Sequence, residues 1–451
     1  MATKPKKVEI RSYNVGFGDC FLMTFLYAGD QKKHVLIDFG STSPPADDPD
    51  LTDAAAGIER DCGGELHAVV ATHRHKDHIG GFATNTKGTA AGDVIRKLAD
   101  KGKALVIQPW TEDPDAPTDF TGGTPGKKGG GAGKGVTKAL YLSQLEHMHR
   151  FAEAVAKESQ RLMKVSDMDA AVGEPMFRAE VAGTEREPGD DNIEEIRKDT
   201  VATDIAGTNA SKSLIKHLAF IGEDNVKNLK AVKNLQAMGS RHEYLSFGEK
   251  TKLEDVLPGV KVHVLGPPTI DQYDKIQKQR SADPDEFWML RKKMWQSRNE
   301  FWQMQAANAT RTVREATGAI FPKYKRAKDI PRSSRWFVRR LRGARAKQLL
   351  ELVLVMDQAM NNTSVILLFE VGGKKLLFPG DAQIENWEYA LEHPDEKTRA
   401  RIRKLLSDVD FYKVGHHGSR NATPKTLWEL FTKRSADKAD ETRLRTMIST
   451  K

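Results

Sequence analysis

Alternating and apolar segments at the start of the chain predict a β-sheet. Residues 8–15 alternate between apolar and polar side chains, and residues 20–27 and 35–39 are largely apolar. A glycine-containing turn at residues 16–19 separates the first two segments. A short turn between two strand-like runs is typical of a β-hairpin, so we expect a hairpin followed by a third, buried strand.

Further along the chain, strand-like segments alternate with a segment that has helical spacing. Residues 66–72 form another apolar run, residues 90–101 have the spacing of an amphipathic helix, and residues 104–108 are strand-like. Near the other end of the chain, residues 361–381 predict a hairpin and residues 410–414 a strand. Strands that alternate with helices indicate a layered α/β domain.

The central part of the chain interrupts this pattern. Residues 121–138 are rich in glycine and lysine but lack the spacing of a phosphate-binding loop, so they are interpreted as a solvated linker. A chain of 451 residues exceeds a typical single domain, so insertions are expected. The pattern assigns residues 1–110 to the first half of a core, 111–250 to an insertion that is partly flexible and helical, 251–268 to a core strand, 269–350 to a basic helical insertion, and 351–451 to the second half of the core.

Composition narrows the class of protein. The chain has 71 Lys and Arg against 62 Asp and Glu, a net charge of +9 that favours anionic partners. It has two cysteines, Cys20 and Cys62, which argues against a disulfide framework and fits a reducing compartment. No apolar run reaches the roughly 18 residues of a membrane span, so we expect a cytoplasmic protein without membrane contact.

A basic stretch at residues 323–347 is the best candidate for contacts with phosphate groups. It combines arginines and lysines with aromatic side chains and contains one acid, Asp329. Arginine holds phosphate through two parallel hydrogen bonds, and aromatic rings stack on bases. The candidate substrate contacts are Arg335, Arg339 and Arg340. The alternative is a solvated basic helix, or one that pairs with the acidic residues 185–199.

Four metal-ligand side chains are crowded into one loop. Residues 66–82 read LHAVVATHRHKDHIGGF, which places His73, His75, Asp77 and His78 directly after a strand. Imidazole and carboxylate groups are the ligands that zinc and similar cations prefer. His73 and His75 can converge on one ion if the chain is extended, and Asp77 and His78 can face a second ion after it turns. The alternative is an exposed polar loop.

This loop resembles the HxHxDH signature of the metallo-β-lactamase superfamily. Three further segments strengthen the resemblance and occur in the order of that superfamily: YNVGFGDCFLMTF with HVLIDFG, then NNTSVILLFEVGGKKLLFPGD, then FYKVGHHGSRNAT. The first of them is similar to the hydrolase domain of ComEC-type competence proteins. The resemblance implies an α/β fold, the αββα sandwich, here with large and mostly helical insertions.

The same resemblance implies further site residues. Asp381 corresponds to a metal-bridging carboxylate, and His417 to a late ligand, with His416 as a proton donor or a neighbour of the ligands; the reverse assignment of these two histidines stays open. Independently of the resemblance, Asp38 at the end of the apolar strand 35–39 would orient a ligand histidine, or else cap a helix or form the turn before Gly40 and Ser41. The superfamily pattern has a histidine where this chain has Asn361 and Asn362, so these amides, water or an inserted histidine would complete the first metal site. Arg420 could hold a phosphate oxygen.

These residues predict a metal-dependent hydrolase with two divalent ions, zinc first and manganese as the alternative. Asp77 or Asp381 would orient the attacking water, and His416 would protonate the leaving group, so Asp77 and His416 are the expected catalytic residues. The ComEC-type resemblance and the basic stretch favour cleavage of phosphodiesters in DNA or RNA. The alternatives are a small phosphodiester or nucleotide signal as substrate, or a scaffold subunit with a partly decayed site that binds a protein partner or a second copy.

Overall fold

The computed structural model describes residues 4–116, 142, 228–273, 276, 360–418 and 422–449. These residues belong to one compact unit, bounded as Met1–Glu146, Asn228–Arg280 and Gln358–Lys451. The basic stretch 323–347, the glycine-rich segment 121–138 and the four candidate phosphate contacts, Arg335, Arg339, Arg340 and Arg420, lie outside the described residues.

The first sheet has six strands in the order β1-β2-β3-β4-β5-β6. The strands β1, β2 and β3 pair antiparallel, and the strands from β3 to β6 pair parallel. The predicted hairpin is confirmed, since Ser12 pairs with Phe21 across the turn. The strands are β1 (Lys7–Ser12), β2 (Cys20–Leu26), β3 (Lys32–Phe39), β4 (Ala68–Val70), β5 (Leu105–Pro109) and β6 (Arg241–Leu245).

The second sheet has five strands in the order β11-β10-β9-β8-β7. The strands β7, β8 and β9 pair antiparallel, whereas β9, β10 and β11 pair parallel. The strands are β7 (Lys261–Gly266), β8 (Ile366–Val371), β9 (Lys374–Phe378), β10 (Phe411–Lys413) and β11 (Arg445–Met447).

Apolar side chains fill the space between the two sheets. On β2, Phe21, Met23 and Phe25 face this central core, whereas the alternate residues Cys20 and Leu22 pack on the other face of the sheet. The ring of Phe21 lies 6.1 Å from that of Phe378 in the second sheet, edge to face. Both faces of β2 are therefore covered, which explains why its sequence reads as a continuous apolar run.

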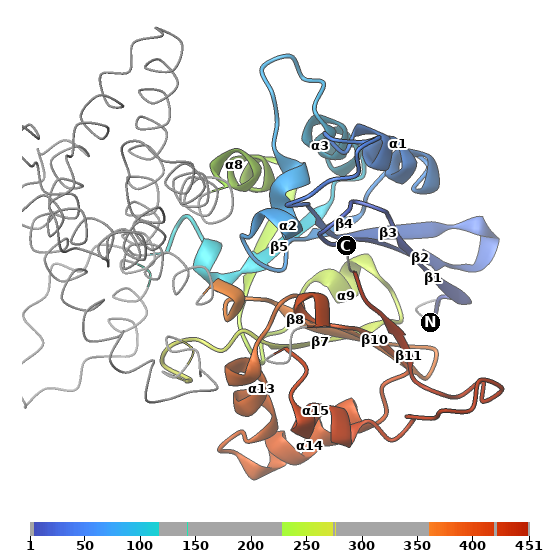
Figure 1. Cartoon of the computed structure of the whole chain (residues 1–451), viewed down its shortest axis with the longest axis vertical. Helices are drawn as coiled ribbons and strands as arrows, with labels where there is room; N and C mark the ends of the chain where they lie inside the picture. Colours follow the sequence, from blue (N-terminus) through green and yellow to red (C-terminus); the bar gives the residue numbers. More distant parts are fainter. Residues whose placement is uncertain are drawn as a thin grey trace, which may run out of the picture. The chain divides into compact units, whose positions relative to one another are not determined.

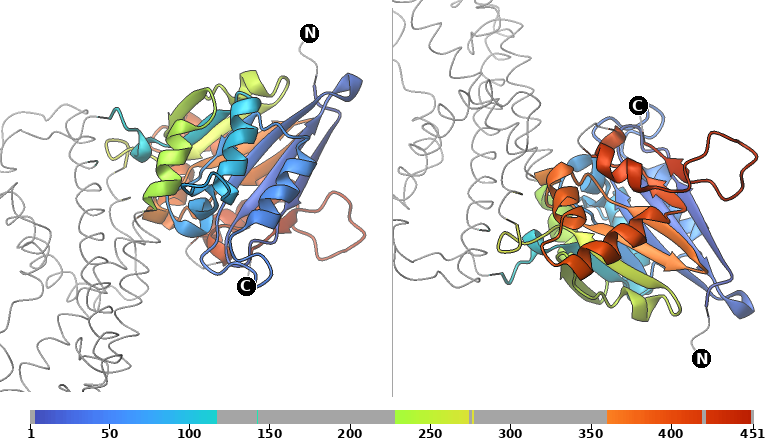
Figure 2. Two further views of the ribbon diagram at one scale, coloured as in Figure 1. Left: turned by 90° about the horizontal axis from the view of Figure 1, so that it is seen from above. Right: turned by 90° about the horizontal axis from the view of Figure 1, so that it is seen from below.

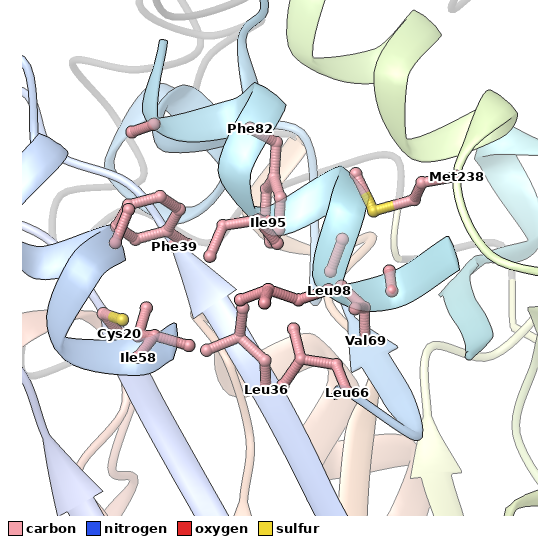
Figure 3. Packing of buried hydrophobic residues seen from close by; sticks show 14 of the residues in the cluster. Cys20, Leu36, Phe39, Ile58, Leu66, Val69, Phe82, Ile95, Leu98 and Met238 are labelled. Atoms are coloured by element: carbon pink, nitrogen blue, oxygen red, sulfur yellow. The ribbon is translucent and has the colours of Figure 1, made fainter. Parts of the chain in front are cut away.

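Three helices cover the outer face of the first sheet: α1 (Thr52–Asp61), α3 (Ala91–Lys101) and α8 (Leu229–Ala237). In Figure 3, Ile58 of α1 and Ile95 and Leu98 of α3 lie over Leu36 and Val69 of the sheet. The buried residues of α3 recur every three or four positions, as an amphipathic helix requires.

The outer face of the second sheet is covered by α13 (Ile384–Leu391), α14 (Glu396–Ser407) and α15 (Lys425–Leu430). Asp395 caps α14, because its side chain accepts a hydrogen bond from the amide of Thr398 at 2.8 Å. The layers are thus helices, sheet, sheet and helices (Figure 1), and the views from the two helical faces in Figure 2 show each set over its own sheet. The predicted mixed α/β architecture is confirmed.

Two features of the topology differ from the sequence pattern. Both α8 and β6 lie within residues 111–250, the range assigned to an insertion, yet β6 pairs with β5 and α8 packs on the first sheet. The side-chain amide of Asn234 on α8 donates to the carbonyl oxygens of Phe82 and Gly92. These bonds fix the helix against its neighbours. The strand β11 was not predicted, because its three residues RTM carry no periodic signal.

Two expectations from the composition concern the cysteines and the apolar character of the helices. Cys20 and Cys62 are both buried and free, as expected of small apolar side chains. Within the part of the chain that the structure describes, no helix combines the length and the apolar character needed to span a bilayer.

A pair of neighbouring histidines, His34 buried and His67 half-buried, predicts sensitivity to acid. The backbone amide of His34 donates to Nδ1 of His67, and Nδ1 of His34 lies 3.1 Å from Oγ1 of Thr24. Burial lowers the pKa of both imidazoles to about 4. Since the unfolded chain then binds more protons than the folded one below pH 6.5, their contribution to stability is complete above that pH and is lost as the pH falls towards 4.

We expect the variant with His34→Gln and His67→Gln to lose less stability on acidification than the wild type. The measurement is urea unfolding of chelator-treated protein from pH 7 to pH 4.5. The slope of the unfolding free energy against pH should differ between the two proteins in this range, by an amount that corresponds to up to about one bound proton per histidine. Equal slopes would show that these histidines are not held neutral by burial.

Candidate metal centre

The histidine-rich loop folds where β4 ends. After Thr72 and His73 the chain turns at His75, whose carbonyl oxygen accepts hydrogen bonds from the amides of His78 and Ile79. The short helix α2 (Lys76–Ile79) then places the side chains of Asp77 and His78 in the interior. Glycine allows the loop to lie close to the end of β3: a Cβ atom on Gly40, which follows β3, would lie 2.7 Å from the carbonyl carbon of Asp77.

The second sheet contributes two loops to the same place. Asp381 follows β9, and its amide donates to Oγ of Ser364 at 3.2 Å. His416 and His417 follow β10, and both have left-handed backbone angles, with φ of 43° and 50°. The amide of His416 donates to Oδ1 of Asp381 at 3.0 Å, which joins the two loops.

Four of the predicted ligands meet in one cluster. Ligand atoms of Asp77, His78, Asp381 and His417 all lie within 4.8 Å of one another. Nε2 of His78 is 3.1 Å from Oδ2 of Asp381, and Nε2 of His417 is 3.1 Å from Oδ2 of Asp77. Two imidazoles and two carboxylates that converge in a buried space form a donor set that suits zinc and similar divalent cations.

Asp38 holds one of these histidines, as an orienting carboxylate should. Its Oδ2 lies 2.8 Å from Nδ1 of His78 and accepts from the hydroxyl of Thr72, while its Oδ1 accepts from the amide of Thr72. With Nδ1 directed to Asp38, Nε2 of His78 faces the cluster. These contacts favour the orienting role of Asp38 over that of a helix cap or turn former.

His73 and His75 lie beside the cluster but form a separate pair. Nε2 of His73 is 3.0 Å from Nδ1 of His75, and the ring of His73 is 4.2 Å from that of His78. Within the described ranges, neither residue belongs to a group of three acid or histidine ligands within 4.8 Å. His73 and His75, which the sequence pattern assigns to one ion, therefore stand apart from the cluster of four.

The two asparagines that replace the expected histidine differ in their contacts. The side chain of Asn362 is hydrogen-bonded through both of its polar atoms. Its Nδ2 donates to Glu385, and its Oδ1 and backbone carbonyl oxygen accept from Nδ2 of Asn386. Asn361 is 2% exposed, and its Oδ1 has no hydrogen-bond partner among the described residues. Its turn lies next to the centre, because the amide of Val365 donates to the carbonyl oxygen of Thr72. A buried acceptor without a donor is the kind of group that a cation would satisfy.

The charges of the cluster support one another. Burial opposes a charge on His78, but the carboxylates of Asp381, Asp38 and Asp77 outweigh burial and hold its pKa well above the usual value. Burial would raise the pKa of Asp381 and Asp77, but His78 and the other histidines hold the pKa of both carboxyls below the usual value. Both acids are therefore anionic at neutral pH, as metal ligands must be.

The two late histidines have opposite electrostatics. Burial lowers the pKa of His416, whose side chain is 31% exposed. For His417 the hydrogen bond to Asp77 outweighs burial and raises its pKa. His417 belongs to the cluster of four, whereas Nε2 of His416 stays 3.9 Å from Oδ2 of Asp381. This geometry favours His417 as the ligand.

The sequence did not single out three residues that contact this centre. Asp19 forms a buried ion pair with Lys413, and Asp19 also accepts a hydrogen bond from Ser449. Lys413 had a usable signal, because a lysine inside the apolar strand DFYKV must find a buried acid. Ser449 had none.

Comparison with known proteins agrees with part of this description. Residues 13–101 match a family model described as the metallo-beta-lactamase superfamily, whose members are mostly metal-dependent hydrolases. The match includes Asp38 and the histidine-rich loop, and it ends before Asp381 and His417. Searches of curated proteins and of solved structures gave no significant match.

The two late histidines can be distinguished by metal content. We expect His417→Gln to lower zinc affinity by at least about 100-fold, because it removes a direct ligand, and His416→Gln to change it by less than about tenfold. Competition with a chromophoric chelator measures both affinities. The opposite ranking would assign the ligand to His416.

The roles of Asn361 and Asn362 can be distinguished by substitution. Asn361→Ala should weaken binding of a second metal equivalent and leave the stability of the metal-free protein nearly unchanged. Asn362→Ala breaks buried hydrogen bonds and should cost about 1–3 kcal/mol of unfolding free energy. Titration calorimetry and urea unfolding test the pair, and a stability loss confined to Asn361→Ala would contradict the assignment.

Proposed function

We propose that this protein is a metal-dependent phosphodiesterase that cleaves DNA or RNA. The observation that carries the proposal is the buried convergence of Asp77, His78, Asp381 and His417 at the edge where β4, β9 and β10 end. Buried acids and histidines gathered in one place are expensive for a fold to maintain, and they are typical of functional sites.

Two positions would hold the cations. Asp77, His78, His417 and Asp381 would hold one ion, and His73, His75, Asp381 and the amide oxygen of Asn361 would hold the other more weakly. Bound there, zinc or manganese supplies Lewis acidity and brings the pKa of water close to neutrality. Asp381, which contacts the amide of His416 through Oδ1 and His78 through Oδ2, would serve both positions.

His416 is placed for proton transfer at the solvent side of the centre. Its side chain is the most exposed of the histidines gathered here, at 31%, and its lowered pKa leaves it uncharged at neutral pH. A neutral imidazole accepts a proton before it can donate one. We therefore propose that His416 accepts or relays a proton, besides the role of proton donor expected from sequence.

Charge supports a polyanionic substrate. The chain carries a net charge of +9, and the region 323–347 contributes a dense run of arginine and lysine, including Arg335, Arg339 and Arg340. Arg420 lies three residues after His417 in the sequence. Guanidinium groups are the expected means of holding a phosphate backbone.

The direct test is cleavage of labelled single- and double-stranded DNA and RNA by zinc- or manganese-loaded protein. Asp77→Ala should lower kcat/KM by at least about a thousandfold, and His416→Gln by about 10²–10⁴-fold, the usual contribution of a proton-transfer group. His393→Gln is the control, since His393 stacks on Phe247 beside α13, and it should retain full activity.

Each negative result has a distinct meaning. Bound metal without cleavage of nucleic acid, but with cleavage of bis(p-nitrophenyl) phosphate or nucleotides, would contradict the nuclease and point to a small phosphodiester. Absence of metal binding would contradict the enzyme altogether and leave the scaffold role.

A further inference from the structure

A second layer of contacts around Asp19 joins the two sheets beneath the candidate metal centre. Asp19 is 1% exposed and lies at the start of β2. Its amide donates to the carbonyl oxygen of Asp77 at 2.8 Å, and its own carbonyl accepts from the amide of Gly40. Asp19 is therefore fixed to the backbone of the histidine-rich loop.

The carboxylate of Asp19 reaches across to the second sheet. Its Oδ2 pairs with Nζ of Lys413 on β10, and its Oδ1 accepts from the hydroxyl of Ser449, two residues after β11. Lys413 is 2% exposed. A buried ammonium group is stable only with such a partner, so this ion pair fixes β10 against the first sheet.

Ser449 also contacts the ring of His417. Its carbonyl oxygen is 3.1 Å from Nδ1 of His417, and the ring of Phe17 lies 4.2 Å from the imidazole. With Nδ1 directed to this carbonyl group, Nε2 is left facing Asp77. His417 has a left-handed backbone, with φ of 50°, so its ring direction depends on external contacts.

The strand β11 holds Ser449 in position. The amide of Val414 donates to the carbonyl oxygen of Met447 at 2.8 Å, and a Cβ atom on Gly418 would lie 2.7 Å from Ile448. The segment 445–449 is thus packed along the loop that carries His417.

We propose that Asp19, Lys413 and Ser449 form an inter-sheet clasp that positions His417 for metal binding. The clasp sets the distance between the histidine-rich loop of the first sheet and the His417 loop of the second. It rests on the proposed metal site, but its structural part can be tested without metal. The three residues are positioning residues and are not assigned contact with substrate.

The experiment compares Ser449→Ala, Asp19→Asn and the double variant in the full chain. Each single change should weaken zinc affinity by about 10- to 100-fold, the usual effect of altering a partner of a metal ligand. The double variant should bind zinc about as weakly as the weaker-binding single variant. The reason is that both changes break the contact between Asp19 and Ser449. The controls are Ser435→Ala and Asp48→Asn, which should retain the wild-type affinity within about twofold.

Asp48 is a matched control because it is also a buried acid, in the segment between β3 and α1. It accepts from the amides of Asp53 and Ala54, and neither contact involves Lys413 or Ser449. Loss of affinity in Asp48→Asn equal to that in Asp19→Asn would mean that general destabilisation, and not positioning, is measured, and it would overturn the clasp.

The second readout uses metal-free protein. Hydrogen exchange of the Val414 amide, which bonds to β11, should accelerate at least about tenfold in Ser449→Ala and should not change in Ser435→Ala. Unchanged exchange in Ser449→Ala would overturn the clasp whether or not the protein binds metal. If the wild type binds no zinc but exchange responds as expected, the proposed function fails and the inter-sheet contact stands without its metal role.

Discussion

The structure depends on the burial of carboxylates where the two sheets meet. Asp19, Asp38, Asp77 and Asp381 are each less than a tenth exposed. Removing a charge from water costs several kcal/mol unless partners replace the lost solvation. Here His78 contacts Asp38 and Asp381, His417 contacts Asp77, and Lys413 contacts Asp19. Each of these four acids has a cationic or imidazole partner, and most of these pairs connect elements far apart in the sequence.

Local pattern was sufficient for the layered fold and for half of the site. The strands β2, β3 and β4 read as apolar runs because both faces are covered, and HxHxDH concentrates four ligands in six residues. Asp38 was identifiable because an acid at the end of an apolar strand must find a buried partner. These features follow from residues within a short window, where periodicity and ligand chemistry are informative.

What the sequence could not predict is long-range pairing. Ser449 and Asp19 are 430 residues apart in the chain, and no local rule relates a serine after a three-residue strand to a turn near residue 19. The same holds for α8 and β6, which follow a long interruption of the pattern and return to the first sheet. The choice between Asn361 and Asn362 also required three dimensions, since only their contacts distinguish adjacent identical side chains.

The two halves of the centre are unequal, and the inequality has a chemical consequence. In the proposed centre, one position would have the carboxylates of Asp77 and Asp381 with the imidazoles of His78 and His417, whereas the other would have His73 and His75 with an amide oxygen in place of a third imidazole. A neutral amide oxygen is a weaker and harder ligand than imidazole, so it shifts preference from zinc towards manganese or magnesium. If Asp381 serves both positions as proposed, an ion held by Asp77, His78 and His417 would lower the charge available to the ion at His73 and His75. We therefore expect stepwise occupancy, with a tight ion and a loose one, from the whole donor set and not from one missing residue.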